Sequence, residues 1–173
     1  GGAFGNGAVY KLSRSSSGWT ESVIYSFQGG TDGANPVGGV ILDKAGNLYG
    51  TTFDGGINGG GIIYKLSPSS TGWKFTVLYS FVGGYGGPYN KLTLSNGSLY
   101  GFTNSEGAYG LGSIFKLTPS NGTWTLTDLY DFPGGSEGGL PYGSVAVDNA
   151  GNVFGTAVVG GSNNQGIIFE ITP

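Results

Sequence analysis

Apolar and polar residues alternate along short stretches of this chain, and glycine-rich turns separate the stretches. Alternation with a period of two is typical of β-strands, whereas no stretch carries the 3.6-residue period of a helix. The sequence therefore predicts an all-β protein. In the best-defined part of the chain, four successive strands are expected over residues 38–43, 47–53, 61–67 and 73–81.

Both faces of these expected strands carry apolar side chains. In the 61–67 strand, Ile63 is expected to point opposite to Tyr64, and in the 73–81 strand Val77 and Tyr79 are expected opposite Leu78. A four-stranded sheet with two apolar faces has to lie between neighbouring sheets, as a blade does in a β-propeller.

The four-strand pattern recurs at a fixed spacing. Four copies of one segment occupy residues 7–12, 61–66, 112–117 and 166–171, at offsets of 54, 51 and 54 residues. The repeats divide this single domain into units 1–27 (third and fourth strands), 28–81 and 82–132 (four strands each), and 133–173 (first three strands). Repeats of about this length are typical of propeller blades. We predict β-propeller-like blades, about three units plus one extra strand, with a β-trefoil as the alternative.

Two segments carry a resemblance to a known family. Residues 46–52 read Gly-Asn-Leu-Tyr-Gly-Thr-Thr, and residues 61–68 read Gly-Ile-Ile-Tyr-Lys-Leu-Ser-Pro. This repeat, which covers essentially the whole chain, resembles the GloVer tandem repeats of bacterial choice-of-anchor surface proteins. The resemblance implies a repeat protein that is extracellular or at the cell surface, and it supplies no catalytic residues.

Composition narrows the chemistry further. The 173 residues include 38 Gly and 7 Pro, carry a net charge of −3 and contain no Cys, His or Met. Catalysis by Ser-His or Cys-His groups, thiolate or imidazole zinc sites and disulfides are therefore excluded. Basic runs and long apolar runs are also absent, so we expect neither a nucleic-acid partner nor a membrane span. No cofactor is expected, and Ca²⁺ bound by loop acids is the lesser alternative.

Aromatic residues are the candidate ligand contacts. Three tyrosines lie in the loops between units, beside glycine pairs, where a ring can stack on a sugar while amides bond its hydroxyls. These are Tyr85, Tyr89 and Tyr142. Alternatively, each ring covers its own loop. The repeated Trp19, Trp73 and Trp124 can form either a stacking surface or part of the packing between blades.

Four loop carboxylates are the candidate catalytic groups. Asp32 and Glu137 share a position after a glycine pair, and Asp54 and Glu106 are expected to share one just after a strand. Asp32 with Asp54, or Glu106 with Glu137, can supply the acid pair that a glycosidase needs about 5–9.5 Å apart. The leading prediction is nevertheless a non-catalytic protein for adhesion, glycan binding or self-assembly with other copies through open blade edges. The alternative is a polysaccharide-active hydrolase or lyase.

Overall fold

The computed structural model describes residues 1–83 and 87–173. These residues form thirteen strands and one short 3-10 helix, so the all-β prediction is confirmed. In chain order the elements are β1 (Ala8–Ser15), β2 (Gly18–Ser26), β3 (Val40–Leu42), β4 (Leu48–Thr52), β5 (Gly59–Ser69), β6 (Gly72–Val82), β7 (Thr93–Ser95), β8 (Ser98–Thr103), β9 (Ser113–Ser120), β10 (Thr123–Asp131), η1 (Gly135–Glu137), β11 (Gly139–Val147), β12 (Val153–Val159) and β13 (Ile167–Ile171).

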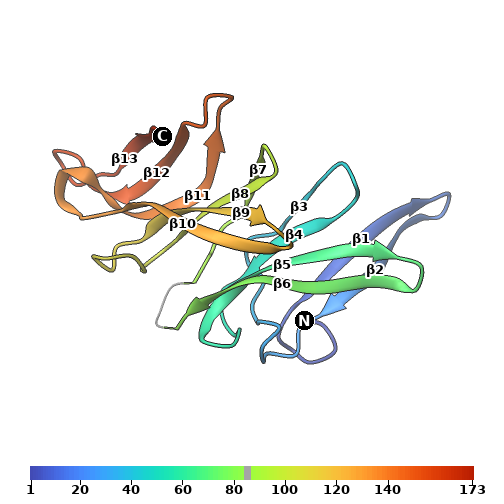
Figure 1. Cartoon of the computed structure of the whole chain (residues 1–173). Coiled ribbons are helices and arrows are strands. Elements are labelled where there is room, and N and C mark those ends of the chain that lie inside the picture. The colour runs from blue at the N-terminus through green and yellow to red at the C-terminus, as the bar shows by residue number, and fades with distance from the viewer. Residues whose placement is uncertain (84–86) are drawn as a thin grey trace.

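Consecutive strands pair antiparallel into four sheets (Figure 1). The first sheet contains β1 and β2, the second β3 to β6, the third β7 to β10, and the fourth β11 to β13. Strands keep their chain order within each sheet, and none of these four sheets closes on itself. Figure 1 shows the first and fourth sheets at opposite ends of the molecule. The described residues thus form an open row of sheets, and the propeller and the trefoil remain predictions.

Tight turns set the register of the outer hairpins. The Asp43 carboxylate accepts the backbone N–H groups of Ala45 and Asn47, each at 2.9 Å, and so closes the turn between β3 and β4. The turn between β7 and β8 uses Asn96 and Gly97 instead, whose φ angles are 48° and 78°. Two residues with positive φ form the type I′ turn that matches the twist of a hairpin.

One expectation about strand faces is wrong in detail. The pairing of β5 with β6 shifts register between Ile63 and Tyr64, which leaves Leu78 as an extra, bulged residue. A bulge interrupts the strict alternation of faces. Leu78 therefore packs on the same cluster as Tyr79, whereas Val77 remains 39 % exposed.

Apolar side chains fill the space between consecutive sheets. The first and second sheets bury Val9, Phe27, Leu48, Ile62, Tyr64 and Leu66. The second and third bury Tyr49, Ile63, Phe81, Leu92, Leu99, Phe115 and Leu117. The third and fourth bury Tyr100, Phe102, Ile114, Phe132, Val145, Val153 and Ala157. Each inner sheet is therefore covered on both faces, which explains why its strands are apolar on both sides.

The same ring contact recurs at each of the three interfaces. Ring centroids lie 5.2 Å apart for Phe27 and Tyr64, 5.5 Å for Phe81 and Phe115, and 5.2 Å for Phe132 and Phe169. Such tilted and edge-to-face pairs are a favourable arrangement of aromatic rings. The chain therefore repeats an interface as well as a sheet.

A glycine makes room for the ring of the next strand. A Cβ atom on Gly101 would lie 2.7 Å from Cζ of Phe115, and Gly50 and Gly155 are equally close to the rings of Tyr64 and Phe169. Backbone approach of this kind is one of the functions of glycine in a strand. The glycine that ends each Gly-Asn-Leu-Tyr-Gly-like motif is thus explained by packing.

Candidate functional site

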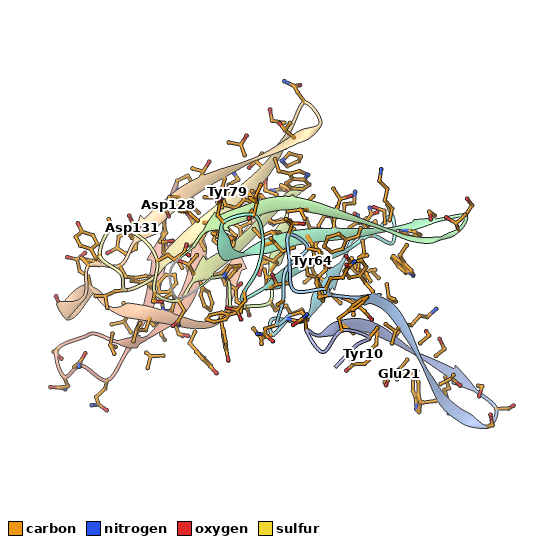
Figure 2. All side chains as sticks on the ribbon, turned by 90° about the horizontal axis from the view of Figure 1, so that it is seen from below. Tyr10, Glu21, Tyr64, Tyr79, Asp128 and Asp131 are labelled. Atoms are coloured by element: carbon orange, nitrogen blue, oxygen red, sulfur yellow. The ribbon has the colours of Figure 1, made fainter. Side chains whose placement is uncertain are left out.

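One repeated aromatic position is buried between inner sheets but open at the first sheet. Tyr64 and Phe115 are each 1 % exposed, whereas the equivalent Tyr10 is 57 % exposed. Figure 2 shows Tyr10 on the first hairpin at the edge of the molecule and Tyr64 further inside. These side chains point toward the preceding sheet, and the first sheet has none before it among the described residues.

Leucine and tryptophan positions on the same face behave alike. Leu66 and Leu117 are fully buried, whereas the equivalent Leu12 is 51 % exposed. Tyr10, Leu12 and Trp19 point away from the second sheet, and Val23 pairs with Tyr10 on the same side. We call these four residues the outer face of the first sheet.

The three predicted tryptophans therefore have different surroundings. Trp73 and Trp124 are half-buried against the clusters between sheets, and the Trp124 ring lies 6.3 Å from that of Tyr49. Trp19 is 68 % exposed on the outer face of the first sheet. Of the three, Trp19 thus has the ring most accessible to another molecule, and a role of the tryptophans in ligand binding remains a prediction.

At the opposite end of the row, the exposed side chains are those that point away from the third sheet. Ile63 and Ile114 are fully buried because they point toward the following sheet, but the equivalent Ile168 is 84 % exposed. Thr156 pairs with Ile168 and Phe154 pairs with Glu170 on the same side of the fourth sheet. Phe154, Thr156, Ile168 and Glu170 form what we call the outer face of the fourth sheet.

Two of the predicted ligand-binding tyrosines share a hollow. Tyr89, 43 % exposed, and Tyr142, 59 % exposed, line one cavity of about 240 Å³. Val37 and Lys91 line it with them. The sequence therefore identified two residues that come together from different units, while Tyr85 lies outside the described residues.

Asp32 and Glu137 have similar local contacts. The Tyr25 hydroxyl donates to Asp32 at 2.9 Å, and the Tyr130 hydroxyl donates to Glu137 at the same distance. Burial, together with the bond to Asp32, raises the pKa of Tyr25 to about 12. Each carboxylate thus accepts a hydrogen bond from a tyrosine in the strand that precedes it in the chain, β2 or β10. This arrangement is expected of a structural contact.

The expectation that Asp54 and Glu106 share a position in the repeat is wrong. Strand pairing places Thr52 opposite Ile62 and Thr103 opposite Ser113, so Glu106 aligns with Gly55 rather than with Asp54. The Asn35 amide donates to Asp54 at 2.6 Å.

Glu106 is half-buried, and one of its carboxyl oxygens is shielded from solvent. Burial raises the pKa of Glu106 to about 7, and its Oε1 atom has no hydrogen-bond partner. The contacts of the described residues join none of the four predicted carboxyl groups to another. Nor do those residues contain a group of three or more acids placed to hold a metal ion together, so calcium binding stays a prediction.

The sequence did not single out a close pair of acids on β10. Burial, and then the neighbouring Asp131 carboxyl, raises the pKa of Asp128 to about 6. Asp131 has one buried oxygen without a partner. Strand pairing aligns Asp128 with Val77 of the second sheet, so a break in a repeated apolar position was the signal available in the sequence.

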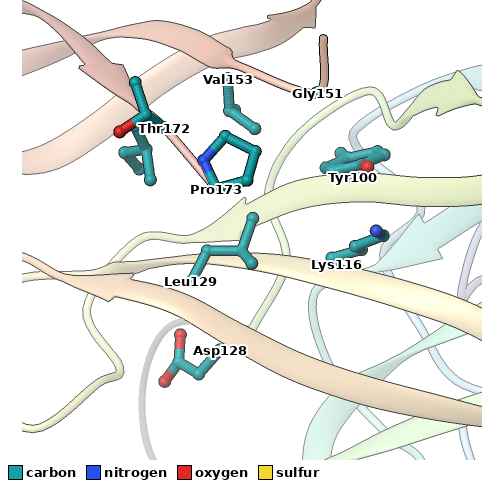
Figure 3. A pocket seen from close by; sticks show the side chains of 9 residues that line it. Tyr100, Lys116, Asp128, Leu129, Gly151, Val153, Thr172 and Pro173 are labelled. Carbon is teal, nitrogen blue, oxygen red and sulfur yellow. The ribbon is translucent and has the colours of Figure 1, made fainter.

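One acid of this pair, Asp128, lines a neighbouring cavity, whereas Asp131 does not. A cavity of about 270 Å³ lies between the third and fourth sheets, and Figure 3 shows Leu129 pointing toward Pro173 inside it. Figure 3 shows the Asp128 carboxyl pointing away from Pro173. The ammonium group of Lys116 lies 5.5 Å from the centre of the Tyr100 ring. The cavity lining thus combines one cation, one acid and apolar groups.

Comparison with known proteins agrees with the repeated architecture. The profile of one family, the Gloeobacter/Verrucomicrobia repeat, matches residues 1–173. No curated protein matches the chain. Helices long and apolar enough to cross a membrane are absent from the described part of the chain. Because the match spans the whole chain, this protein belongs to the Gloeobacter/Verrucomicrobia repeat family.

Proposed function

We propose that this protein is a non-catalytic scaffold that assembles head to tail, the fourth sheet of one copy packing on the first sheet of the next. The observation that carries the proposal is the contrast within each repeated position. Side chains that are buried between inner sheets are exposed only on the two outer faces, as Tyr10, Leu12 and Ile168 illustrate. Exposed apolar faces of this kind mark interaction surfaces.

The two outer faces are complementary because they repeat the two halves of an inner interface. At the interface between the second and third sheets, Ile63 and Tyr49 of one sheet meet side chains that include Trp124 of the next. The fourth sheet presents the equivalent residues Ile168 and Phe154, and the first sheet presents Trp19. Docking in the same register would place Phe154 against Trp19. A blade-like row, as in a propeller, would then continue across copies.

Burial of the two outer faces would favour association. Fully burying a large apolar side chain stabilises by about 1.5–3 kcal/mol. Tyr10, Leu12, Trp19 and Ile168 are each more than half exposed, so their combined burial contributes several kcal/mol before the entropy cost of association is subtracted. A head-to-tail contact between unlike faces generates a closed ring or an open filament.

Local contacts of the acids support the non-catalytic part of the proposal. Asp32, Asp54 and Glu137 each accept a hydrogen bond from a neighbouring side chain, which accounts for their positions without a substrate. An extracellular or cell-surface location, implied by the resemblance, belongs to the same proposal. Neither a metal nor a cofactor is needed for it.

Light scattering on a sizing column over a range of concentrations tests the assembly. Leu12→Arg places a charge on the outer face of the first sheet, and Ile168→Arg places one on the outer face of the fourth. Each charge should prevent that face from packing against another copy. Each variant alone should be a 17.6 kDa monomer. Their equimolar mixture should form a dimer, because each partner retains the face that the other lacks. Ile57→Arg is the matched control, since Ile57 is 76 % exposed but lies outside both outer faces.

Three results would contradict the assembly. The wild-type protein would remain a monomer at every concentration, or each variant alone would still dimerise through its intact face, or Ile57→Arg would disrupt association equally. The hydrolase alternative has a separate signature. Release of reducing ends from xylan or polygalacturonate by the wild-type protein, abolished in Glu137→Gln, would establish it.

A further inference from the structure

The position after the repeated proline is exposed in each of the three units that contain this proline. Val37 follows Pro36, Tyr89 follows Pro88 and Tyr142 follows Pro141, and their exposed fractions are 50 %, 43 % and 59 %. The repeated apolar positions that pack between sheets behave differently. Their side chains are buried in the inner sheets and exposed only on the two outer faces. Exposure after the proline is therefore a property of the position itself and does not depend on a missing neighbouring sheet.

Contacts between neighbouring sheets hold the loops that carry this position. The Thr51 hydroxyl donates to the backbone oxygen of Asn90 at 3.0 Å, and Gly38 lies against the same backbone, where a Cβ atom would collide with it. The Thr93 hydroxyl similarly donates to the backbone oxygen of Val145. These hydrogen bonds thus connect β4 of the second sheet to the Asn90 loop, and the third sheet to the fourth. The hollow that contains Tyr89 and Tyr142 is lined by Asn90 as well.

The ring of Tyr89 also packs against a second aromatic ring. The rings of Phe53 and Tyr89 lie 5.5 Å apart at an interplanar angle of 88°, an edge-to-face contact. Such a contact limits the rotation of the tyrosine ring while it stays 43 % exposed. A ring held in one orientation loses little entropy when a ligand stacks on it.

From this arrangement we infer that the hollow between the post-proline loops binds a saccharide residue. Tyr89 and Tyr142 supply ring surface for the C–H face of a sugar and two phenol hydroxyls for its oxygens. Lys91 supplies an ammonium donor, and no acidic residue lines the hollow. The charge therefore favours a sugar rich in oxygen acceptors, including one that carries a carboxylate.

Size favours one sugar ring over an extended proline-rich peptide. The hollow, at about 240 Å³, is smaller than the roughly 300–1,000 Å³ of pockets for drug-sized ligands. A polyproline peptide advances about 3.1 Å per residue and docks along a series of aromatic slots. The hollow beside Tyr89 and Tyr142 is a single small site, which matches one sugar residue or the end of a chain.

Isothermal titration calorimetry with three hexasaccharides tests the inference. The probes are cellohexaose, xylohexaose and hexagalacturonate, titrated into the full chain. At least one should bind, and Tyr89→Ala and Tyr142→Ala should each weaken that binding by about tenfold, the loss expected for one aromatic contact. Tyr109→Ala is the control, because Tyr109 is 62 % exposed but does not line the hollow. Circular dichroism verifies that each variant folds.

Several outcomes would overturn the inference. One is the absence of heat with all three hexasaccharides. Another is binding that Trp19→Ala abolishes while the tyrosine variants retain it, which would move the site to the outer face of the first sheet. Tyrosine-dependent binding of a decaproline peptide in place of the sugars would assign the hollow to a protein ligand. The sugar assay can fail while head-to-tail assembly succeeds, so the two proposals are tested separately.

Discussion

Leu66 and Leu12 occupy the same position in two units, and shortening each should have very different effects. Leu66 is fully buried between the first and second sheets, whereas Leu12 is 51 % exposed. Leu66→Ala removes buried methyl groups and leaves a cavity, which costs about 2–5 kcal/mol of unfolding free energy. Leu12→Ala loses only about half of the free energy gained by moving a leucine side chain out of water, and it creates no cavity. Its cost should be about 1 kcal/mol.

Urea unfolding followed by tryptophan fluorescence measures both costs in dilute monomer. The difference of at least about 1 kcal/mol should also appear as a melting temperature at least about 2–4 °C lower for Leu66→Ala than for Leu12→Ala. At high protein concentration the cost of Leu12→Ala should rise, because assembly buries that face and stabilises the folded state.

The result that would refute this reasoning is an equal cost for the two variants in dilute monomer. It would mean that the outer face of the first sheet is already covered by the chain itself. A cost for Leu12→Ala that stays constant with concentration would leave the first-sheet comparison intact but would count against assembly through this face.

Two further predictions concern packing and titration. Gly101→Ala should lower stability by about 1–3 kcal/mol in thermal unfolding, because the new methyl group would meet the Phe115 ring, while Gly30→Ala, with nothing within 4 Å, should be neutral. Burial raises the pKa of Glu106 from 4.5 to about 7, so its protonated form contributes stability that is fully present below about pH 4.5 and lost as the pH rises through 7. Glu106→Gln should therefore flatten the decline in stability between pH 5 and 8, and an unchanged decline would contradict the burial of this carboxyl group.

Regular spacing made much of the fold predictable. The recurrence of segments such as 61–66 identified the strands, their order and the all-β class, because local alternation and turn residues act within a few positions along the chain. The bulge at Leu78 was not predicted, since it depends on how β5 and β6 twist against each other. The one-residue error that paired Glu106 with Asp54 has the same origin, because only strand pairing aligns the two units.

The candidate sites were likewise predicted only in part from the sequence. Tyr89 and Tyr142 could be selected from their place in loops beside glycine pairs, but only the folded structure shows that they share a hollow. The Asp128 and Asp131 pair escaped notice because neither residue lies in a loop, and its raised pKa comes from burial and proximity.

By itself the sequence determined which residues repeat, and so which form strands and turns, because those preferences depend on near neighbours along the chain. It could not determine whether a repeated apolar residue is core or surface. Tyr10 and Tyr64 occupy the same repeated position, yet one is 57 % exposed and the other 1 %. The difference arises because burial depends on whether another sheet lies against that face, and this is decided only when the sheets stack in the tertiary structure.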